Sequence, residues 1–287
     1  MIAKRKILGI LLTLITVASF SQNTVWYFGR AKAGLTSYGL DFSDPTSPSY
    51  PAQRNFKSKM DYYESVSVVS DNDGNVLYYS DGIFLYDASH EIMFGAPAQL
   101  KGTGNGTTAS SVQGAYSLLK PGSITEYYLF TSQAIDGGAH GFRVNRIDMA
   151  LPGNGTVDSP LGAVVTADSV LRPTGSEMMT AYGNCGSDTA WVITHEPNSW
   201  NFVTVLVTSN GLQSLTIQNV ETPRSFGGGF NMSKGRGSMD INAEGTHLIL
   251  TGQNPIGTHV LDFNKHTGVL SNPREIMQPA PNDHLPF

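Results

Sequence analysis

The residues of this chain that could carry out chemistry are few and widely spaced. Two histidine–glutamate pairs, His90-Glu91 and His195-Glu196, each place an imidazole beside a carboxylate. Neither pair is followed by a second histidine at the spacing that puts two imidazoles on one helix face, which excludes a zincin-type metal site. The Gly-x-Ser-x-Gly nucleophile turn and the Walker phosphate loop are also absent from the sequence. We therefore expect no catalytic residues, no metal site and no cofactor.

Two segments rich in glycine and acidic residues look like ligand loops but have the wrong spacing. Asp71-x-Asp73-Gly74-Asn75 has its glycine at the fourth position, whereas an EF-hand calcium loop needs glycine at the sixth. Gly102-x-Gly104-x-Gly106 lacks the preceding strand and the following helix that would aim backbone amides at a pyrophosphate. The first segment is interpreted as a hairpin turn and the second as a flexible loop.

His195 and Trp200 are the two candidate binding residues. His195 ends an apolar run that contains Trp191, so it is either a half-buried structural histidine or a ligand contact. Trp200 stands in the polar segment Pro197-Asn198-Ser199-Trp200. It either packs under its loop or is exposed, and exposed tryptophans often mark glycan or protein contacts.

Composition narrows the classes of partner. The chain has 287 residues, with 18 Lys+Arg against 23 Asp+Glu and a formal net charge of −5. This balance offers no basic patch for phosphates, so nucleic acid is not an expected partner. The 13 Phe, 12 Tyr and 3 Trp residues are too many core-type side chains for a disordered chain.

The N-terminus has the pattern of an export signal. Lys4, Arg5 and Lys6 precede the apolar run Ile7–Val17, and small residues follow up to Ser21. The apolar run is within the roughly 7–15 residues of a signal-peptide core and shorter than the roughly 20 of a membrane span. Residues 1–21 are therefore expected to be a signal peptide cleaved after Ser21, with an uncleaved anchor as the alternative. No membrane span is expected after its removal, and the mature chain is expected to be secreted or at the cell surface.

The single cysteine, Cys185, cannot form a disulfide within the chain. The fold must therefore be stabilised by its core. Cys185 is expected to be a small, buried and unreactive residue beside Trp191.

The elements that must position these residues are strands. Short runs of Val, Ile, Thr, Tyr and Phe alternate with turns of Gly, Asn, Asp and Pro, and no amphipathic helical pattern is sustained. The strand runs form quartets that begin at Ser65, Ala115, Met178 and Gly237. Asp73-Gly74 and Glu244-Gly245 supply the tight turns between the first two strands of their quartets. The aspartates of the third strands, Asp87, Asp148 and Asp262, are expected to bond to the amides of the following turns.

Quartets of this period predict an all-β fold, a β-propeller of four-stranded, WD40- or YVTN-like blades. Residues 22–287 are expected to form about four blades, with additional N-terminal closing strands in Trp26–Phe42. The prolines that follow Ser271 predict a poor strand, because proline cannot donate to a ladder. The propeller is therefore expected to be incomplete and truncated at its C-terminus.

Several motifs resemble the N-terminal β-propeller of a family of bacterial surface proteins. They are Trp26-Tyr27-Phe28-Gly29, Ala33-Gly34-Leu35, Ser80-Asp81-Gly82, Leu119-Lys120-Pro121-Gly122, Trp191-Val192-Ile193-Thr194-His195 and Leu261-Asp262-Phe263. The family consists of type IX-secreted, gliding-motility-associated surface proteins of gliding bacteria. The resemblance implies a propeller on the cell surface and assigns no activity to particular residues.

The sequence thus predicts a secreted or cell-surface, non-catalytic recognition or adhesion module. Its expected partner is an extracellular glycan or protein. The alternative is a polysaccharide hydrolase or lyase, with acidic residues and His195 at the mouth of a central channel.

Overall fold

The computed structural model describes most of the chain between residues 24 and 277. The described residues are 24–28, 37–56, 58–60, 64–71, 73–102, 104–105, 108–109, 111–135, 140–183, 188–197, 199–220, 236–252 and 257–277. The regular structure within them consists of strands, without a helix. The expected signal peptide and Cys185 lie outside the described residues.

The described strands form five antiparallel sheets, which we call blades 1 to 5, and one small hairpin. Blade 1 consists of β1 (Val25–Phe28), β2 (Ser37–Asp41) and β3 (Ala52–Phe56); blade 2 consists of β4 (Ser67–Ser70), β5 (Val76–Ser80) and β6 (Leu85–Asp87). The hairpin is β7 (Gly104–Asn105) with β8 (Thr108–Ala109). Blade 3 consists of β9 (Ala115–Leu119), β10 (Glu126–Ser132), β11 (Phe142–Asp148) and β12 (Ala163–Arg172). Blade 4 consists of β13 (Met179–Gly183), β14 (Thr189–His195), β15 (Asn201–Thr208) and β16 (Gly211–Asn219). Blade 5 consists of β17 (Gly237–Ile241), β18 (His247–Gly252), β19 (Gly257–Asn264) and β20 (Val269–Met277).

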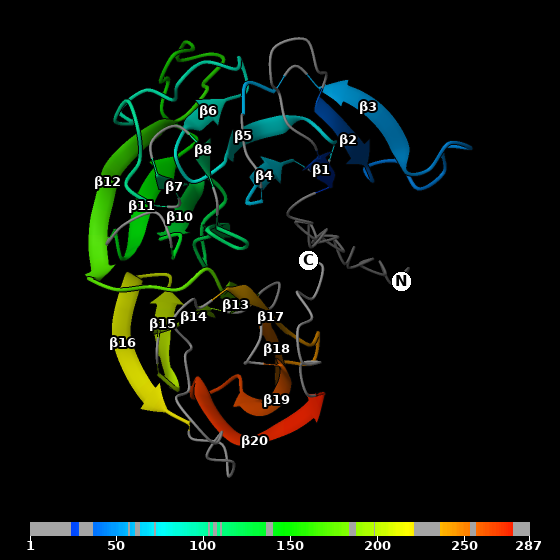
Figure 1. Ribbon diagram of the computed structural model, residues 1–287. Coiled ribbons are helices and arrows are strands. Elements are labelled where there is room, and N and C mark those ends of the chain that lie inside the picture. Colours follow the sequence, from blue (N-terminus) through cyan, green and yellow to red (C-terminus); the bar gives the residue numbers. More distant parts are fainter. Residues whose placement is uncertain are drawn as a thin grey trace, which may run out of the picture.

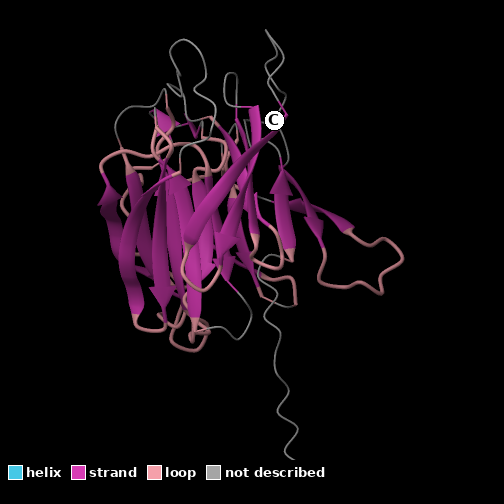
Figure 2. Ribbon diagram, turned by 90° about the horizontal axis from the view of Figure 1, so that it is seen from below, coloured by secondary structure: helices cyan, strands magenta, loops and turns pink. Residues whose placement is uncertain are grey.

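The blades are arranged around a common centre as a β-propeller (Figure 1). The first strand of each blade is innermost, and β1, β4, β9, β13 and β17 contact one another in that order around the centre. The strands of all blades lie side by side with their axes aligned, as Figure 2 shows from below. The predicted fold class is confirmed. The described strands give five blades rather than about four, because β1–β3 form a sheet of their own.

Burial of both faces of the interior blades explains their nearly continuous apolar strands. On β5, Tyr78 belongs to the core between blades 2 and 3, and Tyr79 to the core between blades 1 and 2. On β14, Val192 faces blade 3 and Ile193 faces blade 5. Because successive side chains of a strand point to opposite faces, two neighbouring cores require an apolar residue at every position.

Short polar side chains connect neighbouring blades near their inner strands. The bonded pairs are Thr24 with Ser70 (Oγ1–Oγ 2.9 Å), Ser67 with Ser117 (Oγ–Oγ 2.7 Å) and Thr180 with Asp240 (Oγ1–Oδ1 3.2 Å). They join blade 1 to 2, blade 2 to 3 and blade 4 to 5. These side chains satisfy polar groups where the blades converge.

Gln113, just before β9, connects blade 3 to both later blades. Its Oε1 accepts hydrogen bonds from the backbone N–H groups of Met239 (2.7 Å) and Met179 (3.3 Å). Its Nε2 donates to the carbonyl of Met239 (3.0 Å), and its own N–H donates to the carbonyl of Glu177 (2.9 Å). The side-chain amide thus pairs with the inner edge of β17 as a neighbouring strand would.

The two predicted hairpin turns share a left-handed glycine and a side-chain oxygen that accepts from the amides that follow it. Gly74 and Gly245 have φ values of 81° and 67°, a left-handed conformation that favours glycine. Asp71 Oδ1 accepts from the amides of Asp73 and Asn75. In blade 5, Asn242 Oδ1 accepts from the amides of Thr246 and His247. The segment that resembled a calcium loop is therefore a turn fixed by its own backbone amides.

Two expectations for blade 5 are wrong. Asp262 does not bond to the following turn as Asp87 and Asp148 do; it pairs with Arg274 instead, at 2.7 Å. Asn264, two residues later, accepts from the turn amides. Secondly, β20 continues past Ser271 through Pro273 to Met277, because Asn272 adopts a φ of 48° and the register shifts there. Such a bulge on an outer edge strand accommodates proline.

Replacing Gln113 by leucine tests the connection between the blades. Gln113→Leu removes both partners of the buried Met239 backbone, and we expect the free energy of unfolding to fall by about 2–3 kcal/mol. Urea denaturation followed by circular dichroism measures this loss. Gln213→Leu is the matched control, since exposed Gln213 bonds only locally to the Gly211 carbonyl. Equal stability of the two variants would contradict the assignment.

Candidate functional site

A cavity opens among the inner strands of blades 1, 2 and 3. It has a volume of about 270 Å³ and is lined by Val25, Trp26, Tyr27, Val66, Ser67, Val68, Ala115, Tyr116 and Ser117. These residues lie on or beside β1, β4 and β9, which line the centre of the propeller (Figure 1). The cavity is therefore a site that three blades build together.

The strands beside this cavity are the inner strands of their blades. Within the described sheets, β1, β4 and β9 are the terminal strands of their blades. A terminal strand pairs along one edge and presents N–H and C=O groups along the other. On β17, such an inner edge bonds to the side-chain amide of Gln113 through the backbone of Met239. The cavity therefore lies beside the inner edges of three blades.

The side chains that line the cavity are aliphatic, aromatic or hydroxylic. Ser67 and Ser117 bond to each other at 2.7 Å. Burial raises the pKa of the Tyr116 phenol, and the Asp240 carboxylate raises it further. Burial likewise raises the pKa of Tyr27, with a smaller contribution from Tyr79. Both phenols therefore stay protonated at neutral pH and can act only as hydrogen-bonding groups.

Trp26 is the most exposed aromatic residue among those that line the cavity. Its side chain is 51% exposed, and its ring centroid lies 5.0 Å from that of Phe42. Phe42 in turn lies 5.8 Å from Tyr50, which is also exposed. Sequence reasoning missed Trp26 as a site residue. Because Val25 and Tyr27 face blade 2, the alternation of β1 places the Trp26 side chain on the opposite face of blade 1, beside Phe42.

His195, one of the two candidate binding residues, lies inside the protein rather than at the cavity. It is fully buried, not half-buried, and its ring packs edge-on against Phe202 with centroids 5.2 Å apart. Within the described part of the chain, neither ring nitrogen makes a hydrogen bond of ordinary geometry. Burial lowers the pKa of His195 to about 4, although the Ser199 backbone and the Glu196 carboxylate act in the opposite direction.

Trp200, the other candidate, is partly buried against the core between blades 4 and 5. Its ring lies 5.3 Å from that of the buried His259, in a T-shaped contact. Phe202, which contacts His195, belongs to the same core. The fold thus brings His195 and Trp200 to one apolar interface. Their surroundings there support a role in packing.

Glu177 is a buried carboxyl group that sequence reasoning did not identify. It precedes β13 and is 0% exposed. Its Oε1 accepts from the Ile135 N–H at 3.0 Å and lies 3.5 Å from Arg236 Nε, while Oε2 makes no hydrogen bond of ordinary geometry with the described residues. Burial raises the pKa of Glu177 to about 7. The Ile135 amide and Arg236 lower it in part, and Glu64 raises it.

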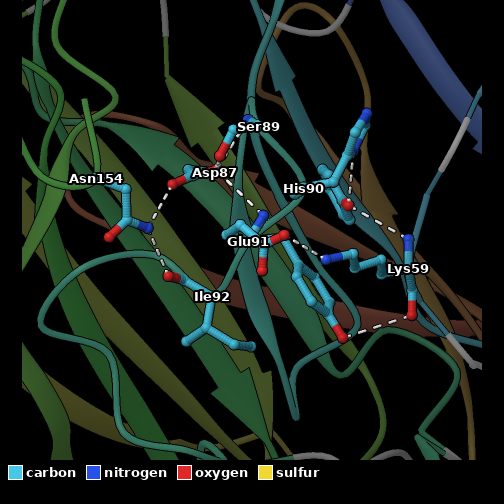
Figure 3. A network of polar contacts seen from close by, with 9 residues as sticks. Lys59, Asp87, Ser89, His90, Glu91, Ile92 and Asn154 are labelled. Carbon is cyan, nitrogen blue, oxygen red and sulfur yellow. Dashed lines mark hydrogen bonds and ion pairs between the residues drawn. The ribbon is translucent and has the colours of Figure 1, made fainter.

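A network of polar contacts surrounds the turn that follows β6 in blade 2 (Figure 3). The Asp87 carboxylate accepts from Ser89 and, at 2.7 Å, from Nδ2 of Asn154 in the loop before β12. The Tyr79 hydroxyl bonds to Nδ1 of His90 at 2.9 Å, and burial raises the pKa of Tyr79 to about 12. These contacts attach the turn after β6 to blade 3 and to the core. The role of this polar network is structural.

The described residues contain no group of three or more His, Cys, Asp or Glu side chains that could hold a metal ion. Nor does the part of the chain that the structure describes include a helix long and apolar enough to span a membrane.

Comparison with known proteins assigns no family. The sequence matches no family model and no curated protein. Among solved structures, the chain is similar to an exo-beta-1,3-galactanase from Phanerochaete chrysosporium in complex with beta-1,3-galactotriose. The identity is 14% and the TM-score 0.38, and the alignment covers 88% of this chain and 49% of that one. The chain spans about half the length of the galactanase, and a likeness at this level assigns neither a fold nor an activity.

The two buried titratable groups make opposite contributions to stability over nearly the same pH range. Glu177, with a pKa raised from 4.5 to about 7, stabilises the fold below pH 4.5, and this stabilisation is lost as the pH rises to about 7. His195, with a pKa lowered from 6.5 to about 4, stabilises it above pH 6.5, and this stabilisation is lost as the pH falls to about 4.

We therefore expect the two single variants to change the pH dependence in opposite directions. Relative to the wild type, Glu177→Gln should gain stability as the pH rises from 4.5 to 7, and His195→Gln should lose it, by roughly 2–3 kcal/mol each. Urea unfolding at pH 4, 5, 6 and 7 measures both differences. Differences that are independent of pH would show that the two groups titrate normally.

Proposed function

We propose that this protein is a secreted, non-catalytic recognition module that binds its ligand in the cavity between blades 1, 2 and 3. The observation that carries the proposal is the composition of the cavity. None of its lining side chains is a carboxylate, a histidine, a lysine or a cysteine. Proton transfer to a substrate requires a group of matched pKa within hydrogen-bonding reach, and tyrosines with raised pKa values do not supply one at neutral pH. The cavity has the components of a binding site without those of acid–base catalysis.

Two sequence features support a role outside the cell. Residues 1–21 have the pattern of a cleaved export signal. The motifs that resemble type IX-secreted surface proteins of gliding bacteria favour display at the cell surface. An extracellular glycan or an extracellular protein is then the class of ligand to be tested.

Binding to arrays of glycans and of extracellular peptides tests the proposed function. Val66→Glu places a charge at a partly buried residue that lines the cavity just before β4, so we expect at least a tenfold loss of affinity for any ligand found. Ile249→Glu is the matched control, because Ile249 is a 43% exposed residue of β18 that does not line the cavity. Equal binding by the two variants would contradict the proposal, as would turnover of the ligand by the wild type.

One observation favours the alternative, a polysaccharide hydrolase or lyase. Glu177 carries a pKa of about 7, and a carboxylic acid that is protonated near neutral pH is suited to act as a general acid. Its complete burial opposes this role, since substrate would have to displace the surrounding loops.

Release of reducing ends and of unsaturated sugars from a panel of polysaccharides tests the alternative. If it is correct, the wild type degrades a polysaccharide and Glu177→Gln is at least 100-fold slower. Glu126→Gln serves as a control, because Glu126 lies on β10 and pairs with Lys120 and Arg146. The absence of turnover by the wild type, or equal activity of both variants, would reject it.

A further inference from the structure

We infer that the outer edge of β16 pairs with the same strand of a second copy of this chain, over residues 215–219. In this dimer, blade 4 of one copy continues into blade 4 of the other as one antiparallel sheet. The inference goes beyond the proposed function, because the cavity is lined by blades 1, 2 and 3. Three observations carry it: the backbone edge of β16, the lack of charge on its hairpin, and the protection of the other outer strands.

β16 is the outermost strand of blade 4 and the last strand of its sheet (Figure 1). After one register shift between Leu212 and Leu215, it pairs residue by residue with β15 as far as Asn219. On its other edge, the backbone of residues 215–219 makes no hydrogen bond within the described part of the chain. The strand therefore presents a regular row of N–H and C=O groups, which is a template for a further strand.

The side chain of Gln218 holds this strand against blade 5. Its Nε2 donates to the Gly268 carbonyl at 2.7 Å, and its Oε1 accepts from the Leu270 N–H at 2.9 Å. Both partners lie where β20 begins. An edge that is already fixed in this way loses little conformational freedom when a second strand pairs with it.

The hairpin formed by β15 and β16 carries no charge. Residues 197–220 contain no Asp, Glu, Lys, Arg or His, although Asp, Glu, Lys and Arg make up 14% of the chain. β16 contains no proline, and its β-favouring residues include Thr216 and the 43% exposed Ile217. When a strand pairs with its own copy, like charges approach each other and repel. A strand without charge or proline avoids this repulsion and pairs readily with itself.

The outer strands of blades 2 and 3 are covered by other parts of the chain. On β6, residues 91–93 return along the outer edge and bond to its backbone. On β12, the Val164 N–H donates to the Phe94 carbonyl at 2.8 Å. Farther along β12, the Asp168 carboxylate accepts from the Lys101 N–H at 2.9 Å. Neither strand offers a continuous edge to a second copy.

The outer strands of blades 1 and 5 carry charged residues. β20 contains Pro273, Arg274 and Glu275 beside the bulge at Asn272, and β3 contains Arg54. Charges, prolines and bulges are the features by which natural sheets avoid edge-to-edge pairing. The regular part of β16 has none of these features. Among the described outer strands, its edge is therefore the one suited to pair with a second copy.

Sedimentation equilibrium of the full chain over a series of concentrations tests this inference. We expect the wild type to form a dimer that dissociates on dilution. We expect no larger species, because a two-fold contact occupies the β16 edge of both copies. A monomer throughout the series, or a continuous series of larger oligomers, would overturn the inference.

Variants of Thr216 locate the contact. Thr216 is exposed near the middle of the paired residues, so Thr216→Lys and Thr216→Glu add a charge there without disturbing a core. Each variant alone should dimerise at least tenfold more weakly than the wild type, because like charges face each other across the two-fold axis. An equimolar mixture of the two variants should recover the dimer, since opposite charges then meet. Thr166→Lys, at an exposed threonine of the outer strand β12, is the matched control and should dimerise as the wild type does.

Two results with these variants contradict the inference. If Thr216→Lys and Thr166→Lys dimerise equally well, the copies meet at another surface. If both Thr216 variants are monomers and their mixture is also monomeric, β16 does not face its own copy. Thermal unfolding of each variant establishes that it is folded.

Discussion

Burial of apolar side chains between adjacent blades is the interaction on which the rest of this structure depends. Four core clusters occupy the four spaces between consecutive blades, and each takes side chains from both of its neighbours. A fully buried large apolar side chain contributes about 1.5–3 kcal/mol. Since no disulfide can form within the chain, this packing has to hold the blades together. It also orients every blade with its first strand toward the centre.

That orientation brings backbone N–H and C=O groups to the centre, because the inner strand of each blade has one edge that its own sheet does not pair. The molecule meets this need with side chains: the amide of Gln113 pairs with β17, and the Ser67–Ser117 and Thr180–Asp240 bonds join neighbouring blades. The cavity lies where β1, β4 and β9 approach the same centre. The position of the cavity thus follows from the way in which the blades pack.

Buried titratable groups show the electrostatic consequence of the same packing. Glu177 and His195 are both fully buried, and burial moves their pKa values in opposite directions because the carboxylate and the imidazolium are the charged forms. Each group favours its neutral state in the folded protein. The surroundings of Glu177 and of His195 therefore both suppress charge.

The sequence by itself determined the fold class, the strand quartets of blades 3 to 5 and the two glycine turns, because strand alternation and turn chemistry are local properties. The run that begins at Ser65 forms a sheet of three described strands, β4 to β6, rather than a quartet. The sequence also indicated the apolar interior of the blades, as at Val203–Val207. Tertiary structure alone decided the candidate site. Whether His195 and Trp200 meet solvent or a core depends on the neighbouring blade, and Trp26, Ser67 and Tyr116 become one cavity only when three blades converge. Glu177 likewise acquires its raised pKa from residues distant in the chain. Local patterns specify which way a side chain points along its strand, but not what the fold places opposite it.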